Sequence, residues 1–508
     1  MTIEYPDPAR RAMITGSTML AAIMVTLDST IANVALPHIQ STLSASPEQV
    51  VWVVTSYVIA QAIATPLSGW LATRYGRREV MTLSVAMFTL ASAACGMAGT
   101  LQALVAFRFL QGIFGAATVP LSQATLLDVY PPEQYGKAMA YYGLGSMLGG
   151  VIGPVVGGAL TEFMSWRWIF LINIPIGVLA ATAMYAFMPR GQTAVSRFDL
   201  FGFAALSIFL ASLQLMIDRG AQLEWFDAVE VQIEAVVAAL SLYVFIVHIA
   251  TERSPYIKPA LFTNRNFVVG SIVATGLGVL VFGALPIFGT MLQQMLGYPV
   301  LLAGMVMAPR SIGTALSMFF AGRLMERIDA RIILFGGVAT TGFAFWQMSG
   351  MSLQTDMRLI LVSGMAMGVG AGLLFVPLST MAFTTLPREL RNEGTAMLAL
   401  FRFIGTSVGI SLLQVQMLRN VATVQARLTE AIRPDNPVLS MSLPAADFSA
   451  PASVLAISRS VTQQAMMVGY IDTYWAMFVL SLLLLPLAFM MKLPRHLDRQ
   501  EMQHGMVE

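Results

Sequence analysis

The sequence predicts an all-α integral membrane protein that crosses the bilayer fourteen times, with its helices grouped as six, two and six. The first observation is composition: 56% of the 508 residues are hydrophobic and only 11% are charged, whereas soluble domains carry about 25% charged residues. The second is that apolar runs, long enough for the about 20 residues that span a bilayer, alternate with short polar connections. The third is an internal repeat, which indicates two related halves.

The fourteen apolar runs also predict the orientation. On the face of the membrane that holds the N-terminus, the connections contain 19 Lys and Arg residues, against 7 on the opposite face. Since positively charged connections stay in the cytoplasm, we expect both termini to be cytoplasmic. The spans are expected near residues 13–36, 49–72, 79–99, 101–126, 137–161, 166–188, 198–217, 229–250, 266–291, 298–322, 331–350, 357–382, 394–418 and 471–491.

The internal repeat consists of a Gly, a Leu and two Arg residues that follow the second and the tenth run at the same spacing. Its copies are Gly69, Leu71, Arg74 and Arg78, and then Gly322, Leu324, Arg327 and Arg331. Chance is the alternative, but the copies occupy equivalent places, and duplicated halves are typical of secondary transporters. The expected domains are a six-helix half at 1–188, a two-helix insertion at 189–265, and a second half at 266–508 that includes a long outer loop at 419–470.

Asp28 is a carboxylate inside the first apolar run, where a charge is costly and therefore indicates a functional site. Asp28 lies eight residues before Leu36, and Arg108 lies eight residues after Thr100. At about 1.5 Å per residue, both lie roughly 12 Å from the same membrane face. Contact with Arg108 favours the ionised acid and desolvation favours the neutral acid, so a site that opens and closes can bind and release a proton. The alternative is a structural ion pair that never titrates.

Other polar residues within the runs are candidates for a substrate cavity. Asn33, Gln111 and Gln123 can face substrate, or they can join neighbouring helices as polar contacts. Arg310 and Arg402 also lie within runs, so with Arg108 there are three arginines and Asp28 is the only clear acid. If these arginines line the cavity, it is positively charged and favours amphipaths with a carboxylate or an acidic phenol. Alternatively, Arg310 or Arg402 braces helices through backbone carbonyls.

Several classes of function lack the residues they need. No lysine closes a G-x-x-x-x-G-K-[ST] loop, so no ATP-binding P-loop is predicted. The single cysteine, Cys95, allows neither a disulfide framework nor a cysteine-based metal site. We therefore expect no metal and no cofactor. A membrane-embedded enzyme or a sensor would be the rival from another class, but the four His residues form no catalytic cluster with acids.

Residues 145–158 form the pattern G-x-x-x-G-x-x-x-G-P-x-x-G-G. Glycines spaced four apart let another helix approach closely, and Pro154 permits a kink, so ordinary helix packing is one interpretation. The full pattern, however, resembles the antiporter motif of the major facilitator superfamily. In that motif the positions are Gly149, Gly153, Pro154, Gly157 and Gly158.

Further segments resemble the fourteen-helix drug:proton antiporters of this superfamily, of the EmrB/QacA type. LDSTIANVALP (27–37), GWLATRYGRR (69–78) and RFLQGIFGA (108–116) resemble motifs of the first helix, the inner loop and the fourth helix. The segments IDRGAQLEWF (217–226), SPYIKPALF (254–262) and QQAMMVGYIDTYW (463–475) resemble the EmrB branch. The resemblance covers nearly the whole chain and implies the major facilitator fold.

The resemblance also implies a function: export of amphipathic compounds from the bacterial inner membrane, coupled to proton entry. Asp28 would carry the proton and Arg108 would tune it. Gly69, Arg74 and Arg78 would belong to the gate. The chain has Thr73 where the inner-loop signature usually has Asp, and Asp128 is the acid that could replace it. The EmrB branch implies a periplasmic adaptor and, through it, an outer-membrane channel. A dedicated exporter of one metabolite or siderophore is the alternative.

Overall fold

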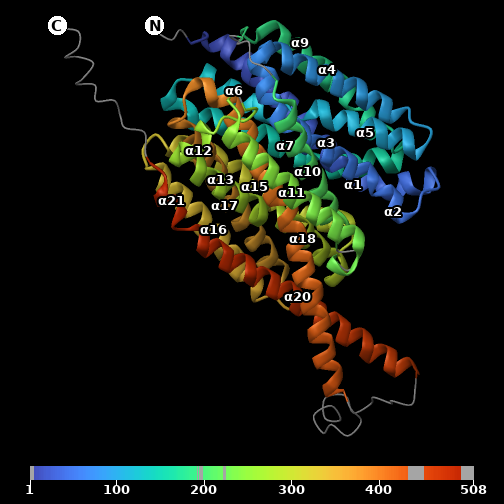
Figure 1. Ribbon diagram of the computed structural model, residues 1–508. Helices are drawn as coiled ribbons and strands as arrows, with labels where there is room; N and C mark the ends of the chain where they lie inside the picture. Colours follow the sequence, from blue (N-terminus) through green and yellow to red (C-terminus); the bar gives the residue numbers. More distant parts are fainter. Residues whose placement is uncertain are drawn as a thin grey trace, which may run out of the picture.

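The computed structural model describes residues 5–190, 193, 198–220, 223, 225–253, 255–432 and 451–492. Within them all regular structure is helical, and the helices form a bundle (Figure 1). The first part of the chain forms α1 (Pro8–Thr42), α2 (Pro47–Val50), α3 (Trp52–Tyr75), α4 (Arg77–Gly96), α5 (Leu101–Gly115), α6 (Thr118–Val129), α7 (Tyr135–Phe163), α8 (Trp168–Leu171) and α9 (Asn173–Phe187).

The rest of the chain adds a helix pair and then a second set of long helices. The pair is α10 (Leu200–Gly220) and α11 (Val229–Thr251). The second set is α12 (Ala260–Thr263), α13 (Arg265–Leu277), α14 (Ala284–Thr290), α15 (Val300–Leu324), α16 (Ala330–Ser349), α17 (Met357–Thr384), α18 (Arg391–Ala431), α20 (Pro451–Leu484) and α21 (Leu487–Met490). Two π-helical segments, η3 (Gly278–Gly283) and η4 (Met291–Met295), flank α14.

Each expected span coincides with a helix or a broken helix, which confirms the all-α membrane architecture. Twelve helices in the described residues are long and apolar enough to cross a membrane. The expected spans at 49–72 and 298–322, which form α3 and α15, are not among them. Both helices carry polar side chains, such as Gln61 in α3 and Arg310 in α15. The count of fourteen therefore stays a prediction.

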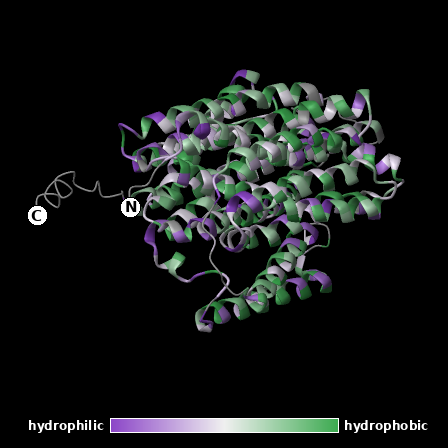
Figure 2. Ribbon diagram, turned by 90° about the horizontal axis from the view of Figure 1, so that it is seen from above, coloured by the Kyte–Doolittle hydropathy of each residue, from purple (hydrophilic) through white to green (hydrophobic). Residues whose placement is uncertain are grey.

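Large apolar side chains are exposed on the outside of the bundle and several charged groups are buried within it, as expected of a bundle in lipid. Hydrophobic colours predominate along the helices in Figure 2. On α11, Ile233, Leu240 and Tyr243 are each more than half exposed, whereas Asp28 and Arg108 are fully buried. With no water in the hydrocarbon, polar groups must find partners inside the bundle.

Long-range packing connects the two sets of helices. α1 packs against α7 and α9, and α17 packs against α15 and α16. Between the sets, α7 packs against α15, and α3 packs against α18. α10 packs against α11, α3 and α18. Division at residues 188 and 265 stays a prediction, because nothing here separates the parts as independent units.

The two ends of the bundle differ. α1 begins and α21 ends at one of them, which we call the terminal end; at the other, the hairpin end, α18 and α20 extend beyond the bundle (Figure 1). The long loop expected at 419–470 is largely helical, because α18 runs to Ala431 and α20 starts at Pro451. Gln425 of α18 donates a hydrogen bond to Thr462 of α20 at 3.3 Å. Residues 433–450 of the expected loop lie outside the described residues.

Candidate functional site

The carboxylate of Asp28, on α1, lies in a polar pocket inside the bundle. Its Oδ2 accepts a hydrogen bond from Arg108 Nη1 of α5 at 2.6 Å. Its Oδ1 accepts from Gln111 Nε2 of α5 at 2.9 Å and from Asn173 Nδ2 of α9 at 2.8 Å. Because a carboxylate only accepts and a protonated acid also donates, these three donors match the ionised form.

Arg108 links Asp28 to a third helix. Its Nε donates to the carbonyl of Val53 on α3 at 3.1 Å, and its Nη1 also donates to Gln111 Oε1 at 2.8 Å. Its guanidinium carbon lies 4.2 Å from the centre of the Tyr57 ring. The planar guanidinium can meet a carboxylate, a carbonyl and an aromatic face together. The ion pair therefore joins α1, α3 and α5.

Asn173 is a partner of Asp28 that sequence reasoning missed. Its Nδ2 also donates to Ser92 Oγ of α4 at 3.0 Å, and the Ser92 hydroxyl donates to the carbonyl of Phe170 at 2.9 Å. In the sequence, the only sign of a role for Asn173 was that it is a polar residue within an apolar run. Nothing in the spacing relates Asn173 to an acid 145 residues earlier, so only helix packing reveals the contact.

A central cavity of about 240 Å³ lies beside this pocket. α1, α3, α6, α7, α15, α17 and α18 all contribute to its lining. Ser29 lines it, whereas its neighbour Asp28 points toward α5 and α9. Arg402 of α18 is the one charged residue of the lining within the described part of the chain. Its guanidinium carbon lies 5.5 Å from the centre of the Phe375 ring.

Two of the other residues expected in the cavity, Gln111 and Gln123, lie elsewhere. Gln111 belongs to the Asp28 pocket, because its side chain bonds to both Asp28 and Arg108. Gln123 of α6 is buried outside the lining, and its Nε2 has no partner among the described residues. The backbone of Asn33 is part of α1, but its side chain lies outside the described part of the chain.

Arg310 also lies off the cavity lining, and its geometry matches the alternative of helix bracing. Its Nη2 donates to the carbonyl of Val281 at 3.2 Å, within the π-helical segment η3. The wider turn of a π-helix departs from the regular ladder of helix hydrogen bonds. The side chain is 5% exposed, and no carboxylate lies within 4 Å of it in the described residues. A contact of Arg310 with substrate stays untested.

The glycine pattern of α7 packs against α1. A side chain at Gly149 would meet the carbonyl of Ile23, one at Gly153 would meet Thr30, and one at Gly157 would meet Ile31. Gly158 faces open space, and the side chain of Pro154 lies outside the described residues. The stripe thus gives the close helix approach expected of it, on the helix that carries Asp28.

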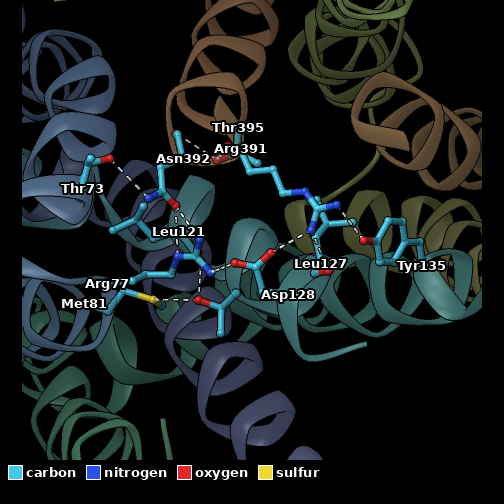
Figure 3. Close-up of polar contacts among 11 residues, drawn as sticks. Thr73, Arg77, Met81, Leu121, Leu127, Asp128, Tyr135, Arg391, Asn392 and Thr395 are labelled. Carbon is cyan, nitrogen blue, oxygen red and sulfur yellow. Dashed lines mark hydrogen bonds and ion pairs between the residues drawn. The ribbon is translucent and has the colours of Figure 1, made fainter. Parts of the chain in front are cut away.

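At the terminal end, Asp128 lies between two arginines from opposite parts of the chain (Figure 3). Its Oδ2 accepts from Arg77 Nη1 at 2.8 Å, and its Oδ1 accepts from Arg391 Nη1 at 2.8 Å. Arg77 also donates to Asn392 Oδ1 at 2.6 and 3.0 Å. Asn392 in turn donates to Thr73 at 3.5 Å. Asp128 thus bridges α6, the start of α4 and the start of α18, and its replacement of the acid absent at Thr73 stays a prediction.

Two further contacts join the same parts at this end. A side chain at Gly69 of α3 would lie 3.0 Å from the Glu393 Cα of α18, so glycine allows the two helices to approach closely here. Lys137 of α7 contacts Glu326, which follows α15, at 2.7 Å. The hydrogen bond from Lys137 lowers the pKa of Glu326 below its ordinary value. The pair therefore persists at neutral pH and is lost when acid protonates Glu326.

The arginines expected at the gate are not the ones that form the network. Arg78 Nε donates to Glu79 at 3.2 Å. Arg74 has no carboxylate within 4 Å in the described residues. Arg77 and Arg391 form the ion pairs with Asp128 instead. Arg74 lies in the last turn of α3, and Arg77 and Arg78 begin α4. Because all three are close in the sequence, the sequence alone could not show which of them contacts Asp128.

Comparisons with known proteins agree with this architecture. The family model described as Major Facilitator Superfamily matches residues 18–410. The chain is 33% identical over 502 residues to the fatty acid resistance protein FarB of Neisseria gonorrhoeae, covering 97% of this chain and 99% of FarB. It is 32% identical over 495 residues to the multidrug export protein EmrB of Escherichia coli (strain K12), covering 96% of each.

Solved structures share the fold. The human organic anion transporter MFSD10 superposes with a TM-score of 0.62 at 14% identity, over 94% of this chain and 100% of that one. The proton:xylose symporter XylE superposes with a TM-score of 0.63 at 11% identity, over 95% and 96%. The family match, the near full-length relatives and the helical bundle together show that this multi-pass membrane protein belongs to the Major Facilitator Superfamily of transporters.

Proposed function

We propose that this protein is a proton-coupled efflux antiporter of the multidrug type in a bacterial inner membrane. The observation that carries the proposal is Asp28, a buried carboxylate paired with Arg108 and adjacent in the chain to Ser29 of the central cavity. An ionisable group at such a place in a membrane protein indicates a pathway for ions or substrate. The relatives named for multidrug export and for fatty acid resistance support efflux as the direction of transport.

Coupling follows from competition between a proton and Arg108 for Asp28. A proton on Oδ2 removes the negative charge, so the Arg108 guanidinium loses its counterion and its 2.6 Å contact. α1 holds Asp28 toward α5 while its Ser29 faces the cavity, so movement of α1 connects the two sites. Binding of a proton from outside favours release of substrate to the outside. Loss of that proton to the cytoplasm allows the next substrate molecule to bind from the cytoplasm.

The terminal end is the cytoplasmic end in this proposal, since Lys and Arg are concentrated in its connections. The network of Asp128, Arg77 and Arg391 then closes the cytoplasmic side. The described conformation is accordingly closed on the cytoplasmic side. Gly69 and the α7 glycine stripe permit the helix approaches on which this closure depends.

The lining of the cavity favours the binding of amphipathic substrates that carry an acidic group. Arg402 supplies the one positive charge of its described lining, and no acidic residue is part of that lining. Tyr142 and Phe375 supply aromatic surface, and Met147 and Met318 supply flexible apolar surface that adapts to different shapes. That adaptability favours a range of substrates over one metabolite. A fatty acid, as in the name of FarB, has the expected combination of carboxylate and apolar chain.

The projecting helices α18 and α20 are the proposed contact for a periplasmic adaptor and, through it, an outer-membrane channel. They extend beyond the bundle at the hairpin end, which faces the periplasm in this orientation (Figure 1). On α20, Val454 and Leu455 are about half exposed beyond the bundle. Exposed apolar side chains on a projecting helix fit helix-to-helix docking.

Asp28→Asn is expected to abolish export driven by a pH gradient in proteoliposomes, while substrate exchange without a gradient continues. The amide keeps the shape of the side chain but cannot take up a proton. The matched control is Glu162→Gln, an exposed acid on α7, which should transport like the wild type. Wild-type rates of gradient-driven export by a correctly inserted Asp28→Asn variant would refute the proton-carrier role.

Arg402→Ala is expected to raise KM for carboxylate-bearing amphipaths by about 10- to 100-fold, since hydrogen bonds to charged groups contribute about 1.5–3 kcal/mol. Neutral amphipaths should be affected much less, and Arg402→Lys should restore acidic substrates only in part because lysine lacks the planar fork. Transport of a panel of acids, cations and neutral compounds measures this. Arg323→Ala, at the end of α15, is the control. Robust wild-type export of quaternary ammonium dyes without export of weak acids would contradict the proposal.

Asp128→Asn is expected to favour opening of the terminal end by about 5- to 30-fold, equivalent to about 1–2 kcal/mol, because the amide loses the charge that attracts both arginines and Asp128 is partly exposed to screening by water. Spin labels at the exposed positions Glu133 and Glu389, in a variant without Cys95, would report a longer distance. Glu79→Gln removes a neighbouring exposed ion pair and should leave the distance unchanged. An unaltered distance in Asp128→Asn would show that other contacts hold this end closed.

Replacing residues 425–465 by a short Gly/Ser linker is expected to remove co-purification of the adaptor and to preserve transport in liposomes. The cut spares the base of the hairpin, where Asn420 donates to Asp472 at 3.3 Å and Gly469 packs on Met417. Pull-down from cells and transport by the same purified protein are the two measurements. If the shortened protein still retained the adaptor in full, docking would lie elsewhere.

A further inference from the structure

A second carboxylate, Asp218, lies within a helix of the bundle. It belongs to α10, two residues before the helix ends at Gly220. The expected span at 198–217 stops one residue earlier, which is why the sequence did not reveal it. Asp218 Oδ2 accepts from the Thr55 hydroxyl of α3 at 3.0 Å, and Oδ1 accepts from Gln214 Nε2 of α10 at 2.8 Å. Both donors are neutral.

No cation lies within 4 Å of Asp218 in the described residues. The adjacent Arg219 turns away to Glu234 of α11, at 2.9 Å. α10 packs against α11, η2 (Trp225–Asp227), α3 and α18. The other ionisable residues at this end of those elements are Glu230 of α11, Asp227 of η2 and Tyr57 of α3, and α18 has none between Arg402 and Arg419. Asp218 therefore lacks the counterion that Asp28 has.

Asp218 is also part of a polar connection between α3 and α18. Gln214 Oε1 accepts from the Ser407 hydroxyl of α18 at 2.7 Å, so the sequence of contacts is Thr55, Asp218, Gln214 and Ser407. Ser411 of α18 donates to the carbonyl of Ile217 at 3.3 Å. Both helices also contribute to the lining of the cavity, α3 through Gln61 and α18 through Arg402. Any change in their separation must alter the surroundings of Asp218.

The two acids lie on opposite sides of the same short piece of α3. Thr55 contacts Asp218, and Val53 and Tyr57, two residues away on either side, contact Arg108. Asp218 thus lies near the depth of the Asp28 and Arg108 pair. Helix movements that admit water to one acid therefore act on the α3 segment that also contacts the other.

We propose that Asp218 binds and releases a proton in each transport cycle, as a second proton-carrying carboxylate beside Asp28. The inference rests on the proposed proton antiport, in which Asp28 stays obligatory because only its protonation releases Arg108, and Asp218 adds a second proton to each cycle. Water supplies the proton, an O–H bond forms at Oδ2, and the Thr55 hydroxyl turns from donating to accepting. Release to water reverses these changes. Both forms keep hydrogen-bond partners, and protonation breaks no ion pair, so Asp218 can alternate between them while its helix stays in place.

The test is the number of protons exchanged per substrate molecule, with the neutral amphipath N-phenylnaphthylamine as the probe. In proteoliposomes with the membrane potential held at zero and a gradient of about one pH unit, each coupled proton contributes about a tenfold substrate gradient at equilibrium. The wild type should reach roughly 100-fold, and Asp218→Asn roughly tenfold. Asp218→Glu, which keeps the carboxyl group, and the exposed control Asp227→Asn should both behave like the wild type.

A second measurement requires no transported probe. In pH-difference infrared spectra, the Asp28→Asn protein should retain a titrating carboxylic C=O band that Asp28→Asn/Asp218→Asn lacks and Asp28→Asn/Asp227→Asn keeps. A tenfold wild-type gradient, an unchanged gradient in Asp218→Asn, or a band that survives in the Asp28→Asn/Asp218→Asn double variant would overturn the inference. Absence of any proton-driven accumulation by the wild type would instead overturn the proposed antiport itself.

Discussion

The buried ion pair of Asp28 and Arg108 is the interaction on which the rest of the structure depends. Moving a carboxylate and a guanidinium from water into a bundle is costly, and their attraction compensates only when other hydrogen bonds satisfy the remaining groups. Here Gln111, Asn173 and the Val53 carbonyl do so. Those partners require α1, α3, α5 and α9 to pack closely around one point. The need to solvate one acid without water therefore helps to set the arrangement of four helices.

Close packing around α1 has a second source, the glycine stripe of α7. Glycine removes the side chains that would hold the two helices apart, so α7 contacts the α1 backbone at Ile23 and Ile31 and the side chain of Thr30. α1 thus has one side against α7, one toward the cavity through Ser29, and one toward Arg108. A helix with three such faces can transmit a change at its carboxylate to the cavity, which is the physical basis of the proposed coupling.

The terminal end uses charge in a different manner. Asp128 is 32% exposed, although its partner Arg391 is buried, so its ion pairs cost less to separate than the fully buried pair of Asp28. Contacts of moderate strength suit an end of the bundle that opens and closes in the proposed function. Arg310 shows the opposite case: it is buried, bonded to a backbone carbonyl and without a carboxylate in the described residues, which suits a fixed brace.

The sequence by itself determined the helical membrane fold, the position of nearly every span and the presence of an acid, Asp28, within the first span, because apolar runs and a lone intramembrane acid are properties of one helix at a time. It also indicated Arg108, since depth along a helix can be counted. Only the tertiary structure decided the remaining partners. Asn173 reaches Asp28, Arg77 and not Arg74 reaches Asp128, Arg402 and not Arg310 lines the cavity, and Asp218 contacts α3. These contacts depend on how distant helices rotate and approach one another, and that information is absent from the periodicity of any single helix.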